Sequence, residues 1–396
     1  MAKADGHNEQ CTMDNVQWKK VKLGDVCHPS NEKYNPLSEH EFQFCVEMEN
    51  INQESGTLNG RSDISKLLSL KNKFQKGDVS YGKLRPYLKK FWLADYDGVC
   101  STEIWVLKNA DYIDNQFLFY LFQSENINRI ANFSSGTKMP RADWQFMAKQ
   151  DVDIPFENGN PSLPAQRRIA AILSAADKVI ASTQKLIAKY KQIKQGMMEE
   201  LFNEQCTMNN VQWRKVRLGE IGDFYVGGDV DKNCFSPYPT MECKYPIYAN
   251  ALVNEGLYGY SSKYGFDKEA VTITGRGDVG KVFYRKPYFT TIIRLVTLIP
   301  TDPNIDVKFL SYAMSKINFI IESTGVPQLT APQAKKYEVS VPYKNGKPDL
   351  TEQRSIASIL SGIDAKIAAE EKVLEKYGKV KKGLMERLLD GDGKDN

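Results

Sequence analysis

The sequence predicts a mixed α/β protein made of two similar halves, each a domain followed by one long helix. Two repeats and one change of texture lead to this prediction. Residues 8–26 and 203–221 are identical at 14 of 19 positions, and residues 163–202 and 350–389 agree at 19 of 40. Between the repeats lie short apolar runs broken by Gly, Pro and Asn, a pattern typical of strands and turns. The two repeats are offset by 195 and 187 residues, which is too long for solenoid or propeller units.

The composition is that of a globular protein with room for two domains. The chain has 396 residues, of which 41% are hydrophobic and 26% charged. We find no run of eighteen apolar residues and no apolar signal core near the N-terminus. Seven cysteines without a CxxC pair favour reduced thiols in a cytoplasmic protein over a disulfide or zinc framework. The net charge of +4 is too small to indicate a nucleic-acid partner by itself.

The first domain is expected to span residues 1–160 as a twisted sheet with few helices. Residues 98–107 (GVCSTEIWVL) predict strand structure, and residues 116–122 predict a helix. Residues 61–108 carry ten basic and five acidic side chains, interleaved with aromatic ones. This mixture is compatible with a surface that contacts nucleic acid.

Each domain is followed by a region, residues 161–202 or residues 348–396, that predicts a long amphipathic helix. Apolar residues recur there at alternating steps of three and four over five heptads, as in a coiled coil. Pro164 and Asp349 lie where helix starts are expected. Two such helices in one chain most simply pack on each other. The alternative is two independent surface helices, each docked on its own domain.

The second domain is expected to span residues 203–347 and aligns only loosely with the first. Residues 270–274 and 292–299 predict strands, and residues 307–315 predict a helix. The helices therefore stay alike while the domains diverge. This is expected if the helices hold a common geometry and each domain recognises something different.

The order of these elements resembles the DNA specificity (S) subunit of type I restriction-modification systems, over essentially the whole chain. The resemblance rests on the starts of the two helices, residues 161–173 and 348–360, and on the Ile154-Pro155 and Val341-Pro342 pairs that precede them. It also rests on the starts of the two domains, which contain Trp18 with Leu23-Gly24 and Trp213 with Leu218-Gly219.

The resemblance implies a fold and a function. Each domain would be a target recognition domain for one half of a split site in double-stranded DNA. The helices would form an antiparallel coiled coil with pseudo-two-fold symmetry that sets the spacing of the half-sites. Two methyltransferase (M) subunits would dock on the chain, and restriction (R) subunits would join through the complex. S-adenosylmethionine and ATP would then be bound by these partners, and this chain would need no cofactor.

A glycine-rich loop at residues 275–280 comes close to a phosphate-binding motif. A phosphate loop must open a helix, with its last residue holding magnesium through a hydroxyl. Here Lys281 is followed by Val282 and by a predicted strand. The loop is therefore interpreted as a hairpin connection.

Other catalytic signatures are absent from the sequence. The adenine methyltransferase motif, Asn/Asp-Pro-Pro-aromatic, is matched neither at Asn35-Pro36-Leu37 nor at Ser236-Pro237-Tyr238. The three histidines, His7, His28 and His40, have no complementary acid or thiol spacing for a metal. The chain alone is expected to be neither an enzyme nor a metalloprotein.

Loops that combine Lys and Arg with Gln, Asn and Thr can neutralise phosphates and also hydrogen-bond to base edges. For each single residue the alternative is a solvated surface charge, and for an aromatic residue a place in the core. The candidate DNA-contacting residues are Tyr81, Lys83, Arg85, Lys89, Thr137, Lys138 and Arg141 in the first domain, and Arg276, Lys281, Gln328, Thr330 and Lys335 in the second.

Residues that recur near the C-terminal ends of both predicted helices form the candidate docking surface for partner subunits. A glycine inside a helix costs about 1 kcal/mol relative to alanine, so its recurrence suggests the close approach of another backbone. A shared ancestral helix end without a partner is the alternative. The candidates are Gly196, Met198, Gly383 and Met385, with Trp18 and Trp213.

Two functions from other classes remain open. One is a self-contained DNA methyltransferase or nuclease, which methyl transfer by the purified chain alone would support. The other is a coiled-coil scaffold with two protein-binding domains, which salt-dependent, sequence-selective DNA binding would exclude.

Overall fold

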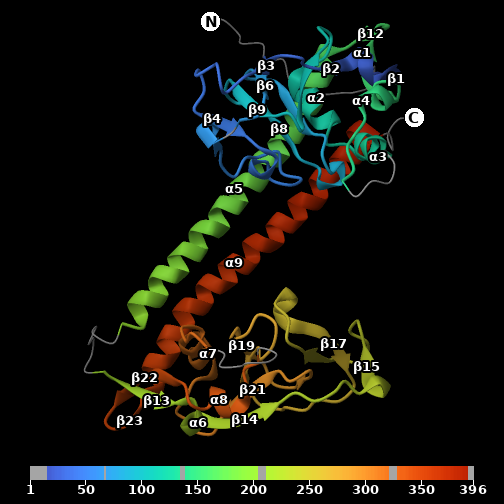
Figure 1. The fold of residues 1–396 in the computed structure, drawn as a ribbon. Coiled ribbons are helices and arrows are strands. Elements are labelled where there is room, and N and C mark those ends of the chain that lie inside the picture. The colour runs from blue at the N-terminus through green and yellow to red at the C-terminus, as the bar shows by residue number, and fades with distance from the viewer. Residues whose placement is uncertain (1–15, 67, 134–138, 204–210, 321–327, 391–396) are drawn as a thin grey trace, which may run out of the picture. The chain divides into compact units, whose positions relative to one another are not determined.

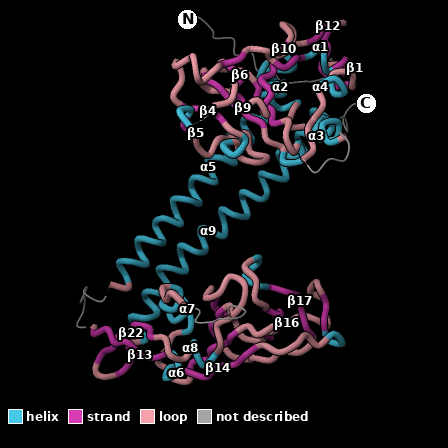
Figure 2. Tube along the Cα trace, in the orientation of Figure 1, coloured by secondary structure: helices cyan, strands magenta, loops and turns pink. Residues whose placement is uncertain are grey.

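The structure is a computed structural model that describes residues 16–66, 68–133, 139–203, 211–320 and 328–390. The chain divides into two compact units. Unit 1 comprises residues 1–185 and 372–396, and unit 2 comprises residues 186–371. Each unit contains one mixed α/β domain and one segment from each of two long helices (Figure 1). The strands are short and are joined by long loops, whereas the long helices are unbroken (Figure 2).

The described residues of unit 1 form three sheets, with strand orders β1-β11-β12, β2-β10-β7-β8 and β3-β6-β9-β4-β5. Its strands are β1 (Gln17–Lys22), β2 (Cys27–Pro29), β3 (Lys33–Tyr34), β4 (Phe44–Val46), β5 (Ser62–Asp63), β6 (Lys71–Phe74), β7 (Val79–Gly82), β8 (Phe91–Leu93), β9 (Gly98–Ser101), β10 (Ile104–Asn109), β11 (Asp151–Glu157) and β12 (Asn160–Pro161). Its short helices are α1 (Leu23–Val26), α2 (Asn115–Leu121), α3 (Glu125–Asn132), α4 (Trp144–Met147) and the 3-10 turn η3 (Pro86–Leu88).

In the part of unit 2 that the structure describes there are also three sheets, with orders β13-β22-β23, β14-β21-β18-β19 and β15-β17-β16-β20. Its strands are β13 (Gln212–Arg217), β14 (Gly222–Val226), β15 (Phe235–Ser236), β16 (Tyr245–Tyr248), β17 (Leu257–Ser261), β18 (Ala270–Ile273), β19 (Val282–Arg285), β20 (Thr290–Thr291), β21 (Val296–Pro300), β22 (Glu338–Lys344) and β23 (Lys347–Pro348). Its short helices are α6 (Leu218–Ile221), α7 (Val307–Ser315) and α8 (Ala331–Ala334).

Two of the three sheets correspond between the units, and the third does not. The β1 sheet matches the β13 sheet, and the β2 sheet matches the β14 sheet strand for strand in the same antiparallel order. The third sheet has five strands in unit 1 and four in unit 2, in a different sequence order. The divergence that the sequence predicted is therefore concentrated in the third sheet and its loops.

The long helices are α5 (Leu163–Leu201) and α9 (Leu350–Met385), and α9 ends in a π turn, η6 (Glu386–Asp390). They run antiparallel within each unit. In unit 1, Lys381 of α9 contacts Asp177 of α5 at 2.7 Å. In unit 2, Lys194 contacts Asp364 at 2.6 Å, and Lys191 contacts Glu371 at 2.9 Å. Residue numbers thus fall on one helix as they rise on the other. The predicted antiparallel helix pair is confirmed, and the alternative of two independent helices is wrong.

Each domain core is completed by both long helices. In unit 1, Leu173 of α5 and Leu389 after α9 belong to one buried cluster with the domain. In unit 2, Leu360 of α9 and Met198 of α5 belong to the corresponding cluster. Full burial of one such leucine stabilises a protein by about 1.5–3 kcal/mol. Each domain is therefore packed onto a helix pair rather than onto a single helix.

The glutamine that is repeated near the start of each long helix has a direct structural role. The Gln166 amide is fully buried, donates to the carbonyl of Tyr112 at 3.0 Å and accepts from the Asp114 amide at 2.8 Å. Gln353 makes the same two contacts, with Asn304 and Asp306. Asp114 and Asp306 in turn cap α2 and α7. The glutamine therefore ties the start of each long helix to the start of a domain helix.

The repeated Leu-Gly pair is explained by a close backbone approach. The amide of Gly24 donates to the carbonyl of Ala148 at 2.9 Å, and a Cβ at Gly24 would lie 3.1 Å from the Cβ of Ala148. Gly219 makes the corresponding contacts with Lys335. A larger residue would push apart the two segments that frame each first sheet.

Two predicted strands differ from the structure. Residues 98–107 form two strands, β9 and β10, which pair in different sheets. Residues 292–299 contain a turn at Ile293 and Arg294, so strand β21 begins only at Val296. The helices predicted at residues 116–122 and 307–315 correspond to α2 and α7, and the glycine-rich loop connects the antiparallel strands β18 and β19.

Candidate nucleic-acid interface

In the first domain, the structure brings together two of the predicted loops. Strand β7 ends at Gly82, and the chain continues through Lys83 to Arg85. The amide of Arg85 donates to the carbonyl of Pro140 at 2.8 Å, and the amide of Ala142 donates to the carbonyl of Lys83 at 2.8 Å. Residues far apart in the sequence therefore form one short backbone ladder at the end of the sheet.

The charged residues of this ladder have different partners. Arg141 contacts both carboxylate oxygens of Glu103, at 3.0 and 3.3 Å, and this contact raises the pKa of Arg141. Arg85 is exposed, adopts a left-handed backbone with φ of 53°, and has no side-chain partner within the described part of the chain. Arg85 is therefore the guanidinium most available to a ligand in this domain.

Two of the other predicted residues of the first domain, Lys89 and Tyr81, are less available to a ligand. Lys89 contacts Glu125 at 2.6 Å and Glu54 at 3.8 Å, and the Lys89 ammonium lowers the pKa of Glu125. Tyr81 is a core residue that is 2% exposed and packs edge-on against Phe122, so its ring cannot reach a ligand. Thr137 and Lys138 lie outside the described residues.

The second domain has a similar loop contact, made by one backbone hydrogen bond, at the corresponding strand. Strand β18 leads into Gly275, whose carbonyl accepts from the amide of Leu329 at 2.9 Å. A Cβ at Gly275 would lie 2.8 Å from the Leu329 carbonyl oxygen, so glycine is required by the contact. The guanidinium of Arg276 donates twice to the Oε1 of Gln328, at 3.2 and 3.0 Å. Two predicted residues from separate loops are thus joined.

The remaining predicted residues of the second domain have mixed roles. Lys281 is exposed at the start of β19. Thr330 caps α8, where its hydroxyl and Gln333 form a capping box, so the hydroxyl is already engaged. Lys335 is exposed, with its ammonium 5.9 Å from the ring centre of Phe224. Lys281 and Lys335 remain free to approach a phosphate.

The corresponding sheets, the corresponding loop contacts and the helix pair together describe one architecture used twice. A family model described as the type I restriction modification DNA specificity domain matches residues 15–192 and, a second time, residues 210–376. The chain belongs to this family.

Individual relatives agree with this assignment. Two proteins of Mycoplasma pneumoniae that are named as type I specificity subunits are similar to the chain. One is 25% identical over 248 residues, covering 63% of this chain and 64% of the relative, and the other is 27% identical over 286 residues, covering 67% and 81%. The crystal structure of a type I restriction-modification S subunit from M. genitalium superposes with a TM-score of 0.65 at 20% identity, covering 95% of this chain and 97% of that one. This likeness shows a common fold.

The predicted docking residues of this specificity-domain protein fall into two groups. Trp213 packs on Phe202 and Phe309, with ring centres 6.0 and 6.4 Å away, and Met198 is 8% exposed in the same core. The corresponding side chains of unit 1, Trp18 and Met385, are half-buried against its core. These four side chains thus also serve the domain cores.

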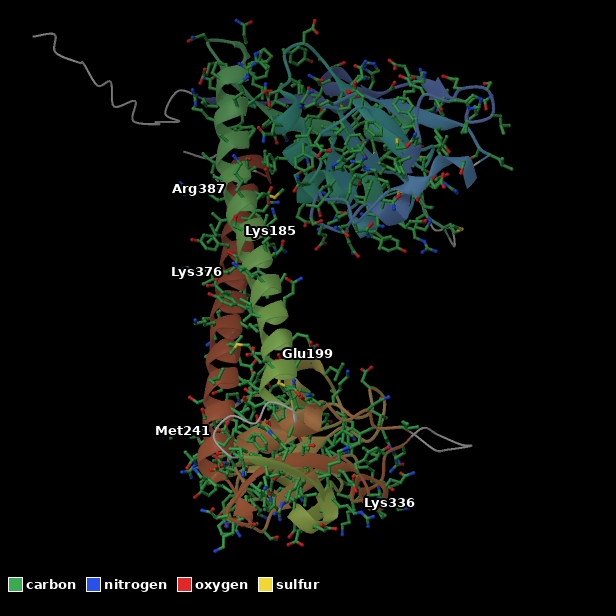
Figure 3. The ribbon with its side chains drawn as sticks, turned by 90° about the vertical axis from the view of Figure 1, so that its left-hand side faces the viewer. Lys185, Glu199, Met241, Lys336, Lys376 and Arg387 are labelled. Atoms are coloured by element: carbon green, nitrogen blue, oxygen red, sulfur yellow. The ribbon has the colours of Figure 1, made fainter. Side chains whose placement is uncertain are left out.

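The two predicted glycines belong to the second group. Gly196 and Gly383 are exposed, and a Cβ at either would meet nothing within 4 Å. Figure 3 shows the neighbouring side chains of Glu199 on α5 and Arg387 beyond α9. No backbone of the described chain approaches these glycines. A docking partner for them remains a prediction.

The described residues contain no group of three or more His, Cys, Asp or Glu side chains that could hold a metal ion. Burial raises the pKa of the thiols of Cys27, Cys45 and Cys100, which disfavours their reactive thiolate form. None of the helices in the described ranges is long and apolar enough to span a membrane.

The prediction from sequence missed three residues at the edge of the second domain: Asn250, Ile293 and Arg294. The Asn250 side chain accepts from the amide of Gly275 at 2.7 Å and donates to the carbonyl of Ile293, so it joins two loops. Asparagine at a loop position is a weak signal for such a role. Ile293 and Arg294 gave no turn signal at all, since neither residue type favours turns.

Proposed function

We propose that this chain confers DNA sequence specificity on a type I restriction-modification assembly, with each domain reading one half of a split target. The observation that supports the proposal is that the two domains share some sheets and differ in another. The β2 and β14 sheets correspond strand for strand, whereas the third sheets differ. A protein that presents two different readers on one scaffold needs this combination.

The basic residues in and beside the contacting loops, which are exposed apart from the half-buried Lys83 and Lys89, have the chemistry for DNA contacts. Lysines contact phosphates as point charges, whereas an arginine fork can donate to two acceptors on one base edge. Under the proposal, Lys83, Lys281 and Lys335 neutralise phosphates, and Arg85 and the Arg276–Gln328 pair contact bases. Arg141 and Lys89 instead hold the first-domain loops through Glu103 and Glu125.

Catalysis is assigned to partner subunits. Under the proposal, two methyltransferase subunits dock on the chain, restriction subunits join them, and these partners bind S-adenosylmethionine and ATP. The helix pair then sets the spacer between the half-sites. A cytoplasmic site of action accords with the nature of the DNA target and remains a prediction.

The test is to map methylated positions in the DNA of host cells that carry or lack the gene for this chain. A methylated motif in two parts, separated by a non-specific spacer, is expected in the first cells and is expected to vanish from the second. Exchange of residues 27–160 for the same domain of a relative is expected to change one half of the motif only.

Two results would contradict the proposal. Methyl transfer from S-adenosylmethionine by the purified chain alone would indicate a self-contained enzyme. A lack of salt-dependent, sequence-selective binding to duplex DNA would favour a protein-binding scaffold.

A further inference from the structure

A two-residue turn at the edge of the second domain has an unusual composition. The turn runs from Ile292 to Leu295, whose amide donates to the carbonyl of Ile292 at 3.2 Å. The central residues, Ile293 and Arg294, both have positive φ, 53° and 61°. This is the pattern of a type I′ turn, which strongly favours Asn and Gly at both positions.

The same chain builds two other such turns with the expected residues. Asn158 and Gly159 connect β11 to β12, with φ of 51° and 85°. Asn345 and Gly346 connect β22 to β23, with φ of 52° and 78°. A β-branched isoleucine in this backbone region is a genuine outlier. Such strain persists only where the surroundings enforce it, and it is concentrated at functional sites.

The surroundings of the turn do enforce it. Ile292 is 1% exposed and Leu295 is fully buried, so both ends of the turn are anchored in the core. The amides of Ile293 and Arg294 donate to the carbonyls of Gly228 and Gly227, at 2.8 and 3.0 Å. The side chain of Asn250 donates to the carbonyl of Ile293. The two central side chains are thus presented on a fixed backbone.

These side chains point away from the core, next to the candidate interface. Ile293 is 46% exposed, and Arg294 is exposed without a side-chain partner in the part of the chain that the structure describes. The carbonyl oxygens of Arg294 and Leu329 both flank Gly275, at 3.4 and 2.8 Å from the place of a Cβ. Arg294 therefore adjoins the loop that carries Arg276.

The first domain contains a parallel case. Arg85 is also an exposed arginine with left-handed φ and no side-chain partner within the described residues, and it lies in the loop ladder of that domain. Each candidate interface therefore includes one unpartnered guanidinium on a strained, fixed backbone. An ordered backbone reduces the conformational entropy lost when such a side chain binds.

We propose that Ile293 and Arg294 form a preformed reading element of the second domain, in which Arg294 donates its two-pronged guanidinium to a guanine edge in the second half-site. The inference rests on the proposed function, because it presumes a DNA target. It adds a specificity-determining residue that neither the sequence repeats nor the family match identifies. Ile293 lies beside Arg294 as an apolar contact for the neighbouring base or sugar.

The test compares purified full-length variants on the methylated motif and on duplexes altered at single positions of the second half-site. Arg294→Lys keeps the charge but loses the planar fork. It is expected to lower affinity for the motif about ten-fold and to abolish discrimination at one guanine. Binding to unrelated duplexes and the slope of affinity against salt are expected to stay unchanged, since no phosphate contact is lost.

A double variant distinguishes the effect of the turn on DNA recognition from its effect on stability. Ile293→Asn with Arg294→Gly places the preferred pair in the turn, so thermal melting is expected to rise by about 2–4 °C while motif affinity falls at least ten-fold. The matched control is the reciprocal exchange in the hairpin before α9, Asn345→Ile with Gly346→Arg. This control is expected to lower the melting temperature and to leave base selection intact.

The outcomes distinguish this inference from the function on which it rests. Wild-type affinity and wild-type base selection in both the Arg294→Lys and the double variant would overturn the reading element, while a split motif in the host DNA would still support the proposed function. The absence of any split motif for the wild-type chain would overturn both.

Discussion

Asp177 on α5 accepts a hydrogen bond from the hydroxyl of Tyr120 at 2.8 Å, and Lys381 on α9 contacts the same carboxylate at 2.7 Å. One aspartate thus connects a domain helix to both long helices of unit 1. Unit 2 repeats the cluster: Asp364 contacts Tyr312 and Lys194, each at 2.6 Å. The ammonium of each lysine also lies over its tyrosine ring, at 5.7 and 5.2 Å. We infer that these clusters fix each domain on its helix pair.

Substitution of the cluster aspartates tests this role. Asp177→Ala is expected to destabilise unit 1 by about 1–3 kcal/mol, because it removes the carboxylate that the Tyr120 hydroxyl and the mostly buried Lys381 ammonium share. The matched control is Lys379→Ala, which breaks the exposed pair with Glu375 on the same helix and is expected to have little effect. The free energy of unfolding of unit 1 is measured by hydrogen exchange at increasing denaturant concentrations. Equal effects of the two substitutions would contradict the assignment.

The tyrosines of the clusters predict a loss of stability at alkaline pH. Burial and the neighbouring aspartates raise the pKa of Tyr120 and Tyr312 in the folded chain. The unfolded chain releases these protons near pH 10, about the ordinary value for tyrosine. Their contribution is therefore fully present below about pH 10 and is lost as the pH rises further.

A variant with Tyr120→Phe and Tyr312→Phe is expected to show a weaker decline of stability above about pH 10 than the wild-type chain. Unfolding followed by circular dichroism at several alkaline pH values measures the slopes. Identical slopes for the variant and the wild-type chain would mean that other groups cause the alkaline loss.

Substitution of the exposed helix glycines is expected to impair the binding of partner subunits without impairing the folding of the chain. Gly196→Leu with Gly383→Leu is expected to stabilise the helices, by up to about 1 kcal/mol per site, since the new side chains meet open space. If methyltransferase subunits dock there, capture of two partners is expected to fail while DNA binding by the isolated chain persists. Native mass spectrometry of the mixed subunits measures the capture.

Gly362→Leu is the control for the glycine variant. Gly362 is also an exposed glycine of α9 with open space around it, but the matching position of α5 is Ala175. Its substitution is expected to leave assembly intact. Normal capture of two partners by the Gly196 and Gly383 variant would exclude these positions from the docking surface.

The helix pair predicts how the spacer of the target can be changed. Because α5 and α9 are paired in both units, an insertion must be made in both helices, after Lys185 and after Glu371. Seven residues in each would preserve the heptad pattern and add about 10 Å of helix. The spacer is expected to grow by about three base pairs at 3.4 Å each, with unchanged half-sites. An unaltered spacer in the methylation map of cells that carry a folded variant would show that other elements set it.

The parts of the fold that follow from local patterns could be predicted from the sequence. The periodicity of the helix repeats predicted α5 and α9, and the loops after β7 and β18 were expected to carry basic residues. The prediction failed where contacts are long-range. Glu103, which contacts Arg141, lies in the turn between β9 and β10, and Tyr81 is buried by Phe122 at the C-terminal end of α2. Ile293 and Arg294 resembled part of a strand because only the tertiary contacts of Gly227, Gly228 and Asn250 enforce their turn.

The mixed make-up of the cores has a consequence for the order of folding during synthesis. Unit 2 is one continuous segment, residues 186–371, whereas unit 1 needs Leu384 and Leu389 from beyond it. The ribosome therefore synthesises the whole of unit 2 before the residues that close unit 1. Until those residues are made, part of the apolar surface of the first domain stays exposed to solvent, and such a state is prone to aggregation. A truncated chain that ends at Glu371 and is released from the ribosome should hold a folded second domain beside an incomplete first one.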